Sequence, residues 1–454
     1  MTTNAPPLDG LPPAQRRRAL LTLSMAIGVS VLGSALPNIA LPGIAHDLGV
    51  TPAASVWVIN AYQIAVTVTL LPFSSLGDIY GYRRVYGLGL ATFILASLLC
   101  ALATDLPSLV LARVLMGLGA AGLMSVNTAL VRTIFPRSML GRGMGFNALV
   151  VATSSAAGPT IAAGLLAVGD WPWLFAINVP IGLASLAMIR ALPLSPRASH
   201  RFDLPSAFLN AAMFGLFIAA LDGFGHGATW ILGASLLAGA IGFGVIFVRR
   251  QTRLAAPMLP VDLFRRPIFA LSVATSVSSF IGQTSAFVAL PFLFQANGAS
   301  EIDTGLMMTP WPLAVALMAP VAGRLSDKYS AGLLGGLGLG CMTIGLLALS
   351  LLDGHPAIWD VAWRMALTGA GFALFQAPNN RALISAVPRE RSGAGSGMLS
   401  TARLLGQTSG AALVGLTFHL TADAGVSVGA SSAVLMGAAF AGLATTLSVL
   451  RLRG

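Results

Sequence analysis

The chain has 454 residues, of which 56% are hydrophobic and only 9% are charged, and its formal net charge is +11. A soluble protein carries about 25% charged residues, so this composition excludes a water-soluble fold and indicates a chain surrounded by lipid. The positive charge does not indicate nucleic-acid binding, because the cations stand in short segments between apolar runs, where they set membrane orientation. Cys100 and Cys341 lie inside such runs and suggest neither a disulfide framework nor a metal site.

The N-terminal segment is rich in proline and ends in Arg16, Arg17 and Arg18. The apolar run that follows is long enough to span a bilayer, which takes about 20 residues, and no small-residue cleavage site is evident. We therefore expect a retained first helix and not a removed signal peptide. Fourteen apolar runs follow one another along the chain: 20–42, 56–76, 85–104, 108–134, 143–168, 173–192, 204–222, 230–248, 268–292, 304–324, 333–352, 358–384, 396–420 and 430–450.

These runs predict an all-α integral membrane protein with 14 transmembrane helices. The expected organisation is a tail (1–19), an N-terminal six-helix bundle (20–192), a linker with two additional helices (193–267) and a C-terminal six-helix bundle (268–454). Placing the N-terminus in the cytoplasm puts all but two of the 26 Lys and Arg residues on the cytoplasmic side, as the positive-inside rule requires. The two exceptions are Arg113 and Arg364. An even number of helices then places both termini in the cytoplasm.

Two short polar segments after apolar runs have a matching pattern. Asp78 and Asp327 each precede a Tyr and a cation within a few residues, and their numbers differ by 249. Arg142 and Arg391 differ by the same 249. A common offset indicates an internal duplication, and parallel repeats of this kind fit a transporter whose two halves rock about a central site.

An Asp at the end of a helix can accept hydrogen bonds from the next helix and pair with a cation of another loop. We expect such clusters to hold the halves together in one state and to release them in the other. The alternative is a plain helix cap with arginines that only set orientation. The residues expected to form this conformational switch are Asp78, Gly81, Arg83, Arg84, Arg142, Asp327, Lys328 and Arg391.

Arg113 and Arg364 lie inside apolar runs, where a charge is costly and is usually paired or functional. The functional hypothesis is a proton relay or a substrate contact, and the alternative is an arginine whose head reaches the nearby membrane surface. Gly158 and Pro159 interrupt the fifth run. A bent helix of small residues suits an interface that opens and closes, although ordinary tight packing explains it equally well.

Amide side chains in apolar runs need partners, so they should face the bundle interior or a wet cavity. Hydrogen bonding between helices is the alternative for each of them. The candidates for the substrate cavity are Asn38, Asn127, Gln283, Phe287, Gln376 and Asn380. The sequence shows no nucleophile–base set and no phosphate-binding loop, so we expect no enzymatic activity, no cofactor and no metal, and an ion gradient as the energy source.

Several of these motifs resemble the major facilitator superfamily, in its 14-helix drug:proton antiporter branch. Asp78-x-x-Gly81-x-Arg83-Arg84 resembles the loop between helices two and three of that family, and Arg113-x-x-x-Gly117 resembles its helix-four motif. Gly158-Pro159 matches the helix-five antiporter motif. The segment 171–180 is similar to a stretch typical of the 14-helix branch, and the segments 201–206 and 402–407 are similar to YebQ-type transporters.

The first helix departs from the pattern of that branch, because Gly33 stands where an Asp is usual. This removes the best candidate for binding a proton or a cationic drug. Asp222, at the end of the seventh run, is the other acid near the membrane to which the proton-relay hypothesis extends.

The resemblance implies a secondary exporter of small lipophilic compounds, a multidrug efflux protein working by proton antiport and alternating access. The alternative is a specific metabolite exporter or a uniporter without proton coupling. We expect a monomer in the bacterial inner membrane whose partners are a small-molecule substrate, protons and lipid, and no nucleic acid.

Overall fold

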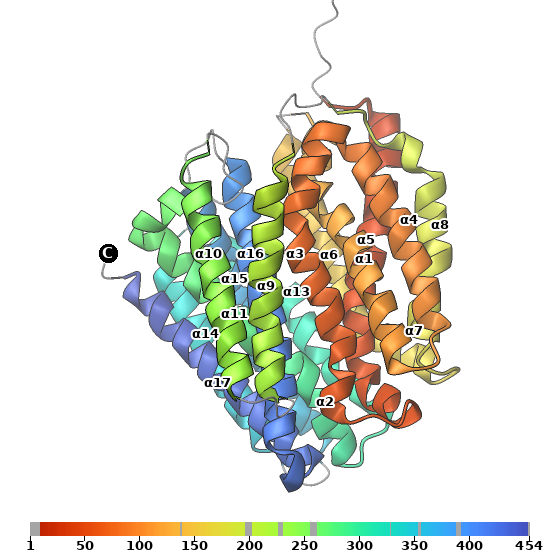
Figure 1. Cartoon of the computed structure of the whole chain (residues 1–454), viewed down its shortest axis with the longest axis vertical. Helices are drawn as coiled ribbons and strands as arrows, with labels where there is room; N and C mark the ends of the chain where they lie inside the picture. The colour runs from red at the N-terminus through yellow and green to blue at the C-terminus, as the bar shows by residue number, and fades with distance from the viewer. Residues whose placement is uncertain are drawn as a thin grey trace, which may run out of the picture.

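The protein is a bundle of helices that run roughly along one common direction (Figure 1). The computed structural model describes residues 10–136, 139–195, 202–225, 230–254, 261–326, 328–352, 356–386 and 392–452. Within these ranges the chain forms α-helices and short 3-10 segments and no strand. The expected all-α fold is therefore confirmed.

Two sets of helices make up most of the bundle. The N-terminal helices are α1 (Pro13–Asp47), α2 (Pro52–Ser55), α3 (Trp57–Tyr80), α4 (Tyr82–Ala101), α5 (Leu106–Ile134), α6 (Leu140–Leu166), α7 (Trp173–Ala176) and α8 (Asn178–Ala187). The C-terminal helices are α11 (Pro267–Ala296), α12 (Glu301–Met308), α13 (Pro310–Leu325), α14 (Ala331–Ser350), α15 (Ile358–Ser385), α16 (Ser392–Leu420) and α17 (Val426–Leu450). Between them come α9 (Leu204–Gly225) and α10 (Trp230–Gln251), and the 3-10 segments are 189–191, 261–265 and 422–424.

Ten helices in the described part of the chain are long and apolar enough to cross a membrane. They are α1, α2 with α3, α4, α5, part of α6, most of α10, α11, α12 with α13, α14 and α17. Trp173–Ala187 and Leu204–Ala220 are shorter apolar helices. Every apolar run of the sequence thus has its helix, α15 and α16 included, and the count of 14 membrane crossings stays a prediction.

The same glycine contact occurs once in each set of helices. In the N-terminal set, a β-carbon on Gly89 of α4 would lie 3.0 Å from the Gly122 Cα of α5. In the C-terminal set, a β-carbon on Gly338 of α14 would lie 2.5 Å from the carbonyl oxygen of Gly371 on α15. Residues 338 and 89 differ by 249, as do 371 and 122, which is the offset of the two Asp segments. Backbones approach this closely only through small residues, so the repeat extends to helix packing.

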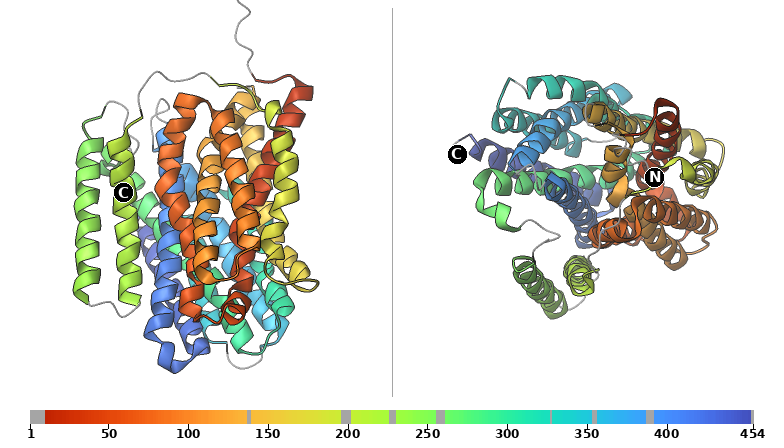
Figure 2. Two further views of the ribbon diagram at one scale, coloured as in Figure 1. Left: turned by 45° about the vertical axis from the view of Figure 1, so that its right-hand side comes forward. Right: turned by 90° about the horizontal axis from the view of Figure 1, so that it is seen from above.

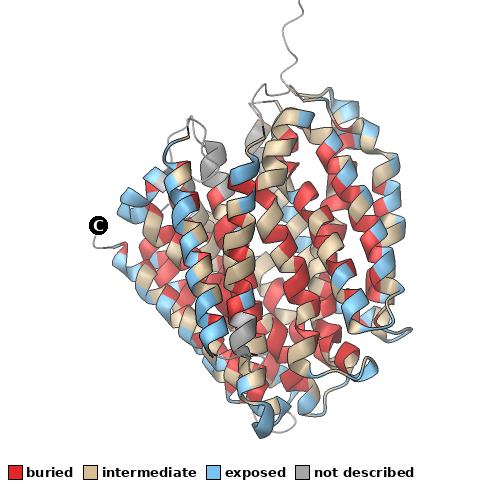
Figure 3. Ribbon diagram, viewed as in Figure 1, coloured by how far each residue is buried: buried red, intermediate tan, exposed pale blue. Residues whose placement is uncertain are grey.

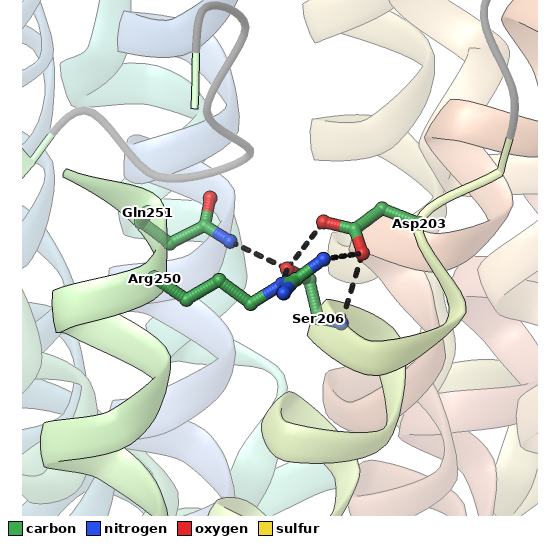
Figure 4. Close-up of polar contacts among 4 residues, drawn as sticks. All are labelled: Asp203, Ser206, Arg250 and Gln251. Carbon is green, nitrogen blue, oxygen red and sulfur yellow. Dashed lines mark hydrogen bonds and ion pairs between the residues drawn. The ribbon is translucent and has the colours of Figure 1, made fainter. Parts of the chain in front are cut away.

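Helices α9 and α10 form a hairpin at the side of the bundle (Figure 2), and α10 is mainly exposed or half-buried (Figure 3). A polar cluster joins their ends (Figure 4): Arg250 Nη2 lies 2.8 Å from Asp203 Oδ1 and Gln251 Nε2 lies 2.9 Å from Ser206 Oγ. On the inner side, Asn210 donates a hydrogen bond of 2.8 Å to the Val68 carbonyl of α3. Polar contacts thus fix the hairpin both internally and to the bundle.

Candidate functional site

Arg113 of α5 is fully buried in the middle of the N-terminal helices. Its Nε donates to the Val58 carbonyl at 2.7 Å, and its Nη1 donates to the Gly33 carbonyl at 2.9 Å. The guanidinium carbon lies 4.4 Å from the centre of the Tyr62 ring and 5.7 Å from that of Phe175. Carbonyl dipoles and aromatic faces therefore solvate this charge. This environment differs from the alternative expected from the sequence, in which the head of the arginine reaches the membrane surface.

The position of the missing acid lies directly beside Arg113. Gly33 is buried, and a β-carbon there would lie 2.5 Å from Met116 Cε and 2.8 Å from Phe93 Cζ. No ion pair to Arg113 occurs in the described ranges, and its Nη2 has no hydrogen-bond partner there. A side chain at position 33 would therefore crowd Met116 and Phe93.

Arg364, at the corresponding place in the repeat, has a different environment. It forms an ion pair of 2.7 Å with Asp360, one turn earlier on α15, and also donates to the Ala348 carbonyl. The Asp360 side chain is 39% exposed. This is a paired arginine near a helix end, so the structure favours the surface alternative here.

Arg403 is a second arginine near Tyr62. The sequence predicted it to be one of the cytoplasmic cations and not a site residue. Arg403 lies within α16, well past its first turn, and its guanidinium carbon lies 5.7 Å from the centre of the Phe280 ring of α11. It is close enough to Tyr62 for an electrostatic interaction. Arg403 is the eighth residue of the apolar run 396–420, and this position is the sequence feature that distinguishes it from the loop cations.

Three of the expected cavity amides lie on C-terminal helices. Gln283 of α11 and Gln376 and Asn380 of α15 are half-buried, and none makes a side-chain hydrogen bond within the described part of the chain. Phe287 is also half-buried, and its ring packs edge-on against Trp311 with 4.9 Å between centroids. Half-buried amides without protein partners need water or a ligand, which agrees with a wet site at this level.

The two asparagines of the N-terminal helices have protein partners. Asn38 donates to the Ser34 and Ala35 carbonyls of its own helix at 3.0 and 3.1 Å. Asn127 donates to Asn147 of α6 at 3.0 Å. For Asn127, this is the hydrogen bond between helices that the alternative describes. Their place in a substrate cavity stays a prediction.

The switch segment between α3 and α4 is held by short-range contacts. Gly81 has φ +97°, a conformation that favours glycine, and so permits the sharp turn. Asp78 accepts a hydrogen bond of 2.8 Å from the Tyr82 hydroxyl, and Arg83 Nη1 donates to the Leu192 carbonyl at 3.4 Å. Arg84 is exposed. Asp78 thus contacts the next helix through the Tyr82 side chain, and its role as a switch stays a prediction.

Other switch and relay residues lie partly outside the description. Lys328 is exposed, whereas Asp327 and Arg391 lie outside the described residues. Arg142 belongs to α6 and Asp222 to α9, but their side chains are not described. The proposed pairing of Asp78 with Arg142 therefore remains a prediction.

Helix α6 carries the Gly158-Pro159 motif at a contact between the two sets of helices. A β-carbon on Gly305 of α12 would lie 2.9 Å from the Pro159 carbonyl oxygen, and one on Gly158 would lie 3.3 Å from the Ala35 β-carbon of α1. Next to Pro159, the Thr160 hydroxyl shares a hydrogen bond of 3.1 Å with the hydroxyl of Thr309, four residues after Gly305. The motif thus lies where N-terminal and C-terminal helices meet.

These contacts lie toward one end of the bundle, the end where α1 finishes at Asp47. Gln295 Nε2 of α11 donates to the Ile39 carbonyl of α1 at 3.5 Å, and the Thr67 and Thr408 hydroxyls lie 2.9 Å apart between α3 and α16. At the Asp47 end, a shallow pocket of about 290 Å³ is lined by Pro42, Ala45, His46, Val50, Pro52, Phe292, Gln295, Ala296 and Val426. The hydrogen bonds that we find between the two sets join their middle and Asp47-end parts.

Two sets of membrane-length helices share a repeated packing contact and are joined by hydrogen bonds at their middle and at the Asp47 end, which is the architecture of a two-bundle membrane transporter. The family model of the Major Facilitator Superfamily matches residues 23–411 and 271–453, and the chain belongs to that family. It is thus a multi-pass membrane protein.

Three named relatives show which kinds of transporter this chain is similar to. The chain is 55% identical over 432 residues to "Uncharacterized transporter YebQ" of Escherichia coli, covering 94% of each chain. It is 30% identical to "Riboflavin transporter RibZ" of Clostridioides difficile, covering 88% of this chain and 87% of the relative. It is 32% identical to "Multidrug resistance protein Stp" of Mycobacterium tuberculosis, covering 88% and 76%. The likeness to YebQ confirms the resemblance drawn from the motifs.

Solved structures support the fold. A bacterial homologue of the human lysosomal transporter Spinster, in an inward-facing and unoccupied conformation, aligns with TM-score 0.69 over 98% of both chains at 15% identity. A POT family transporter in complex with a thioalcohol-conjugated peptide aligns with TM-score 0.70 over 96% of this chain and 95% of its own, at 16% identity. At such identities the likeness is one of fold alone.

Proposed function

We propose that the protein is a secondary active exporter of small lipophilic compounds that works by rocker-switch alternating access. The observation that carries the proposal is the arrangement of the polar contacts. The two sets of helices are joined at the middle and at the Asp47 end, while the side chains of Gln283, Gln376 and Asn380 have no hydrogen-bond partner among the described residues. Contacts that join the two sets toward one end, together with amides left for water or a ligand, suit a carrier that opens to one side at a time.

In the proposed cycle, the halves 20–192 and 268–454 pivot against each other, and α9 and α10 remain at their side. The Pro13 end faces the cytoplasm of a bacterium and the Asp47 end faces outward, following the positive-inside rule. Closing the cytoplasmic side would bring together the switch segments around Asp78 and Asp327. A single copy of the chain contains both halves, which supports a monomer as the working unit.

Proton entry would drive the export. Moving one charge through 100 mV is worth about 2.3 kcal/mol, so one or two protons suffice for a modest gradient. Arg113 and Asp222 remain the proposed relay residues. The names of Stp and of the tetracenomycin C resistance and export protein of Streptomyces glaucescens, which is 30% identical over 87% of this chain, support an export role.

The test uses the purified full chain in everted proteoliposomes with a pH-sensitive dye inside and an imposed proton gradient. Addition of a transported compound should release protons from the lumen, and Asp78→Asn should slow that release while an exposed control, Arg249→Gln, leaves it unchanged. If no compound in a panel of lipophilic drugs releases protons although the protein is folded and oriented, the antiport proposal fails.

A second candidate is a specific metabolite exporter or uniporter without proton coupling. The observation that favours it is the packing at Gly33, which leaves Arg113 without a titratable carboxylate partner. A relative at 30% identity is named "Riboflavin transporter RibZ", which supports a specific metabolite as substrate. Movement of one metabolite down its own gradient, with no proton flux and no response to drugs, would favour this candidate over the first.

A further inference from the structure

Arg403 is a cation within a helix of the bundle that lacks the usual means of compensation. It is half-buried, and the described residues supply neither an ion pair nor a hydrogen-bond acceptor to its guanidinium. Its Nε is buried and has no partner. Arginines inside membrane helices are costly and normally pair with carboxylates or carbonyls. An unpaired one needs another explanation.

Arg451, just beyond α17, shows how this fold accommodates an arginine that only supports structure. It is buried, but its guanidinium donates to Asn379 at 2.6 Å, to Ser272 at 3.2 Å and to Ser448 at 2.6 Å. Three acceptors from three helices thus surround it. Arg403 has none of these, so a purely structural role does not account for it.

The surroundings of Arg403 have two kinds of recognition group. Gln407 lies one turn along α16 on the same face, is half-buried and makes no side-chain hydrogen bond within the described residues. On the other side, Phe280 packs edge-on against Phe372 with 5.4 Å between centroids. The cation therefore shares its helix face with a half-buried amide and lies near an aromatic ring.

The charge around Tyr62 is positive. Arg113 and Arg403 both interact with this side chain, and no Asp or Glu among the described residues interacts with either arginine. Gly33 leaves the nearest helix without its acid. A cationic compound would be repelled here, whereas a carboxylate would find a guanidinium, amide donors and an apolar surface.

We propose that Arg403 is the anion-binding residue of a substrate site between α16, α11 and α3, and that the transported class is lipophilic organic anions, above all carboxylates. This rests on the proposed transport function and names its substrate class. Arg403 binds the anionic group, Gln407 donates further hydrogen bonds, and Phe280 packs against the apolar part of the molecule. Arg113 is sealed from the site by its full burial and adds only its field.

The test is a binding measurement with a matched pair of probes, dansylglycine and its amide, dansylglycinamide. The full chain is placed in nanodiscs of phosphatidylcholine, which has no net charge, at pH 7.5, where the carboxylate is ionised. The wild-type protein should bind dansylglycine roughly ten- to a hundredfold more tightly than the amide, as hydrogen bonds to charged groups imply. Arg403→Gln should abolish the preference, Arg403→Lys should retain part of it, and Arg249→Gln, an exposed control, should leave it intact.

Equal affinity of the wild-type protein for both probes would overturn the proposal, and this measurement requires no variant to fold. An undiminished preference in folded Arg403→Gln would also overturn it. Adding phosphatidylglycerol to the nanodiscs separates solutes from lipid headgroups: if it abolishes dansylglycine binding, the site takes lipid and the substrate claim fails. Because binding is measured without transport, a charge preference without proton-coupled export would refute the proposed function and leave the anion site standing.

Discussion

Substitution of Gly33 is the most informative perturbation, because a side chain at this position tests both the close packing around it and the charge of Arg113. Gly33→Asn adds a neutral side chain of nearly the size of Asp, and Gly33→Asp adds a carboxylate in the same place. A β-carbon here would lie 2.5 Å from Met116 Cε and 2.8 Å from Phe93 Cζ, whereas carbon atoms pack at about 3.5–4.0 Å. Overpacking of this kind costs about 1–3 kcal/mol, so both variants should be less stable than the wild-type protein.

The difference in stability between Gly33→Asp and Gly33→Asn tests whether Arg113 has a charge that a carboxylate can pair with. Its Nη1 already bonds the Gly33 carbonyl at 2.9 Å and its Nη2 has no partner in the described chain, so a carboxylate at position 33 is within reach. A hydrogen bond to a charged group is worth about 1.5–3 kcal/mol. Gly33→Asp should therefore be more stable than Gly33→Asn by roughly that amount at pH 7.

Thermal unfolding in detergent, followed by near-ultraviolet circular dichroism, and the inactivation half-life give the ranking, since unfolding of such proteins is often irreversible. Gly340→Ala is the matched steric control, because nothing lies within 4 Å of a β-carbon at Gly340 and alanine favours a helix. The control should be neutral or stabilising. If Gly33→Asn is as stable as Gly33→Asp, the claim that the charge of Arg113 is unpaired is refuted. If Gly33→Asn is as stable as the wild-type protein, the claim that position 33 is tightly packed is refuted.

Three further outcomes follow from the contacts. Gly371→Ala should lower the unfolding temperature, because backbone of α14 occupies the space of the new methyl, while Gly340→Ala on α14 should not; equal effects would contradict the close approach. Burial raises the pKa of Asp203, but hydrogen bonds from Ser206 and Arg250 outweigh it and leave that pKa below its ordinary value, so the stabilisation is present above about pH 4 and lost below. Asp203→Asn should therefore lower the unfolding temperature at pH 7 by an amount worth under about 1 kcal/mol and by less at pH 3; the same deficit at both pH values would contradict it. Arg451→Met should destabilise the protein by about 1–3 kcal/mol by leaving the Asn379 oxygen unpaired, and Asn379→Leu in the same background should recover part of the loss in unfolding temperature.

The sequence by itself determined the membrane class, the place of the helices and the family. Apolar runs of about 20 residues form helices in lipid because each backbone group must bond within its own segment, so the local pattern is sufficient. The duplication was also readable, since Asp78 and Asp327 share an offset that reappears in the packing of Gly89 and Gly338.

Only the tertiary structure decided what each polar side chain meets. Arg113 and Arg364 occupy similar places in the two repeats, yet one lies among carbonyls and aromatic rings and the other pairs with Asp360. Arg403 looked like one more cation for orientation until α16 was placed against α3 and α11. The helical period tells which residues share a face, but not which helix that face contacts, because hydrophobic residues pack without direction and lipid-facing and protein-facing sides are equally apolar.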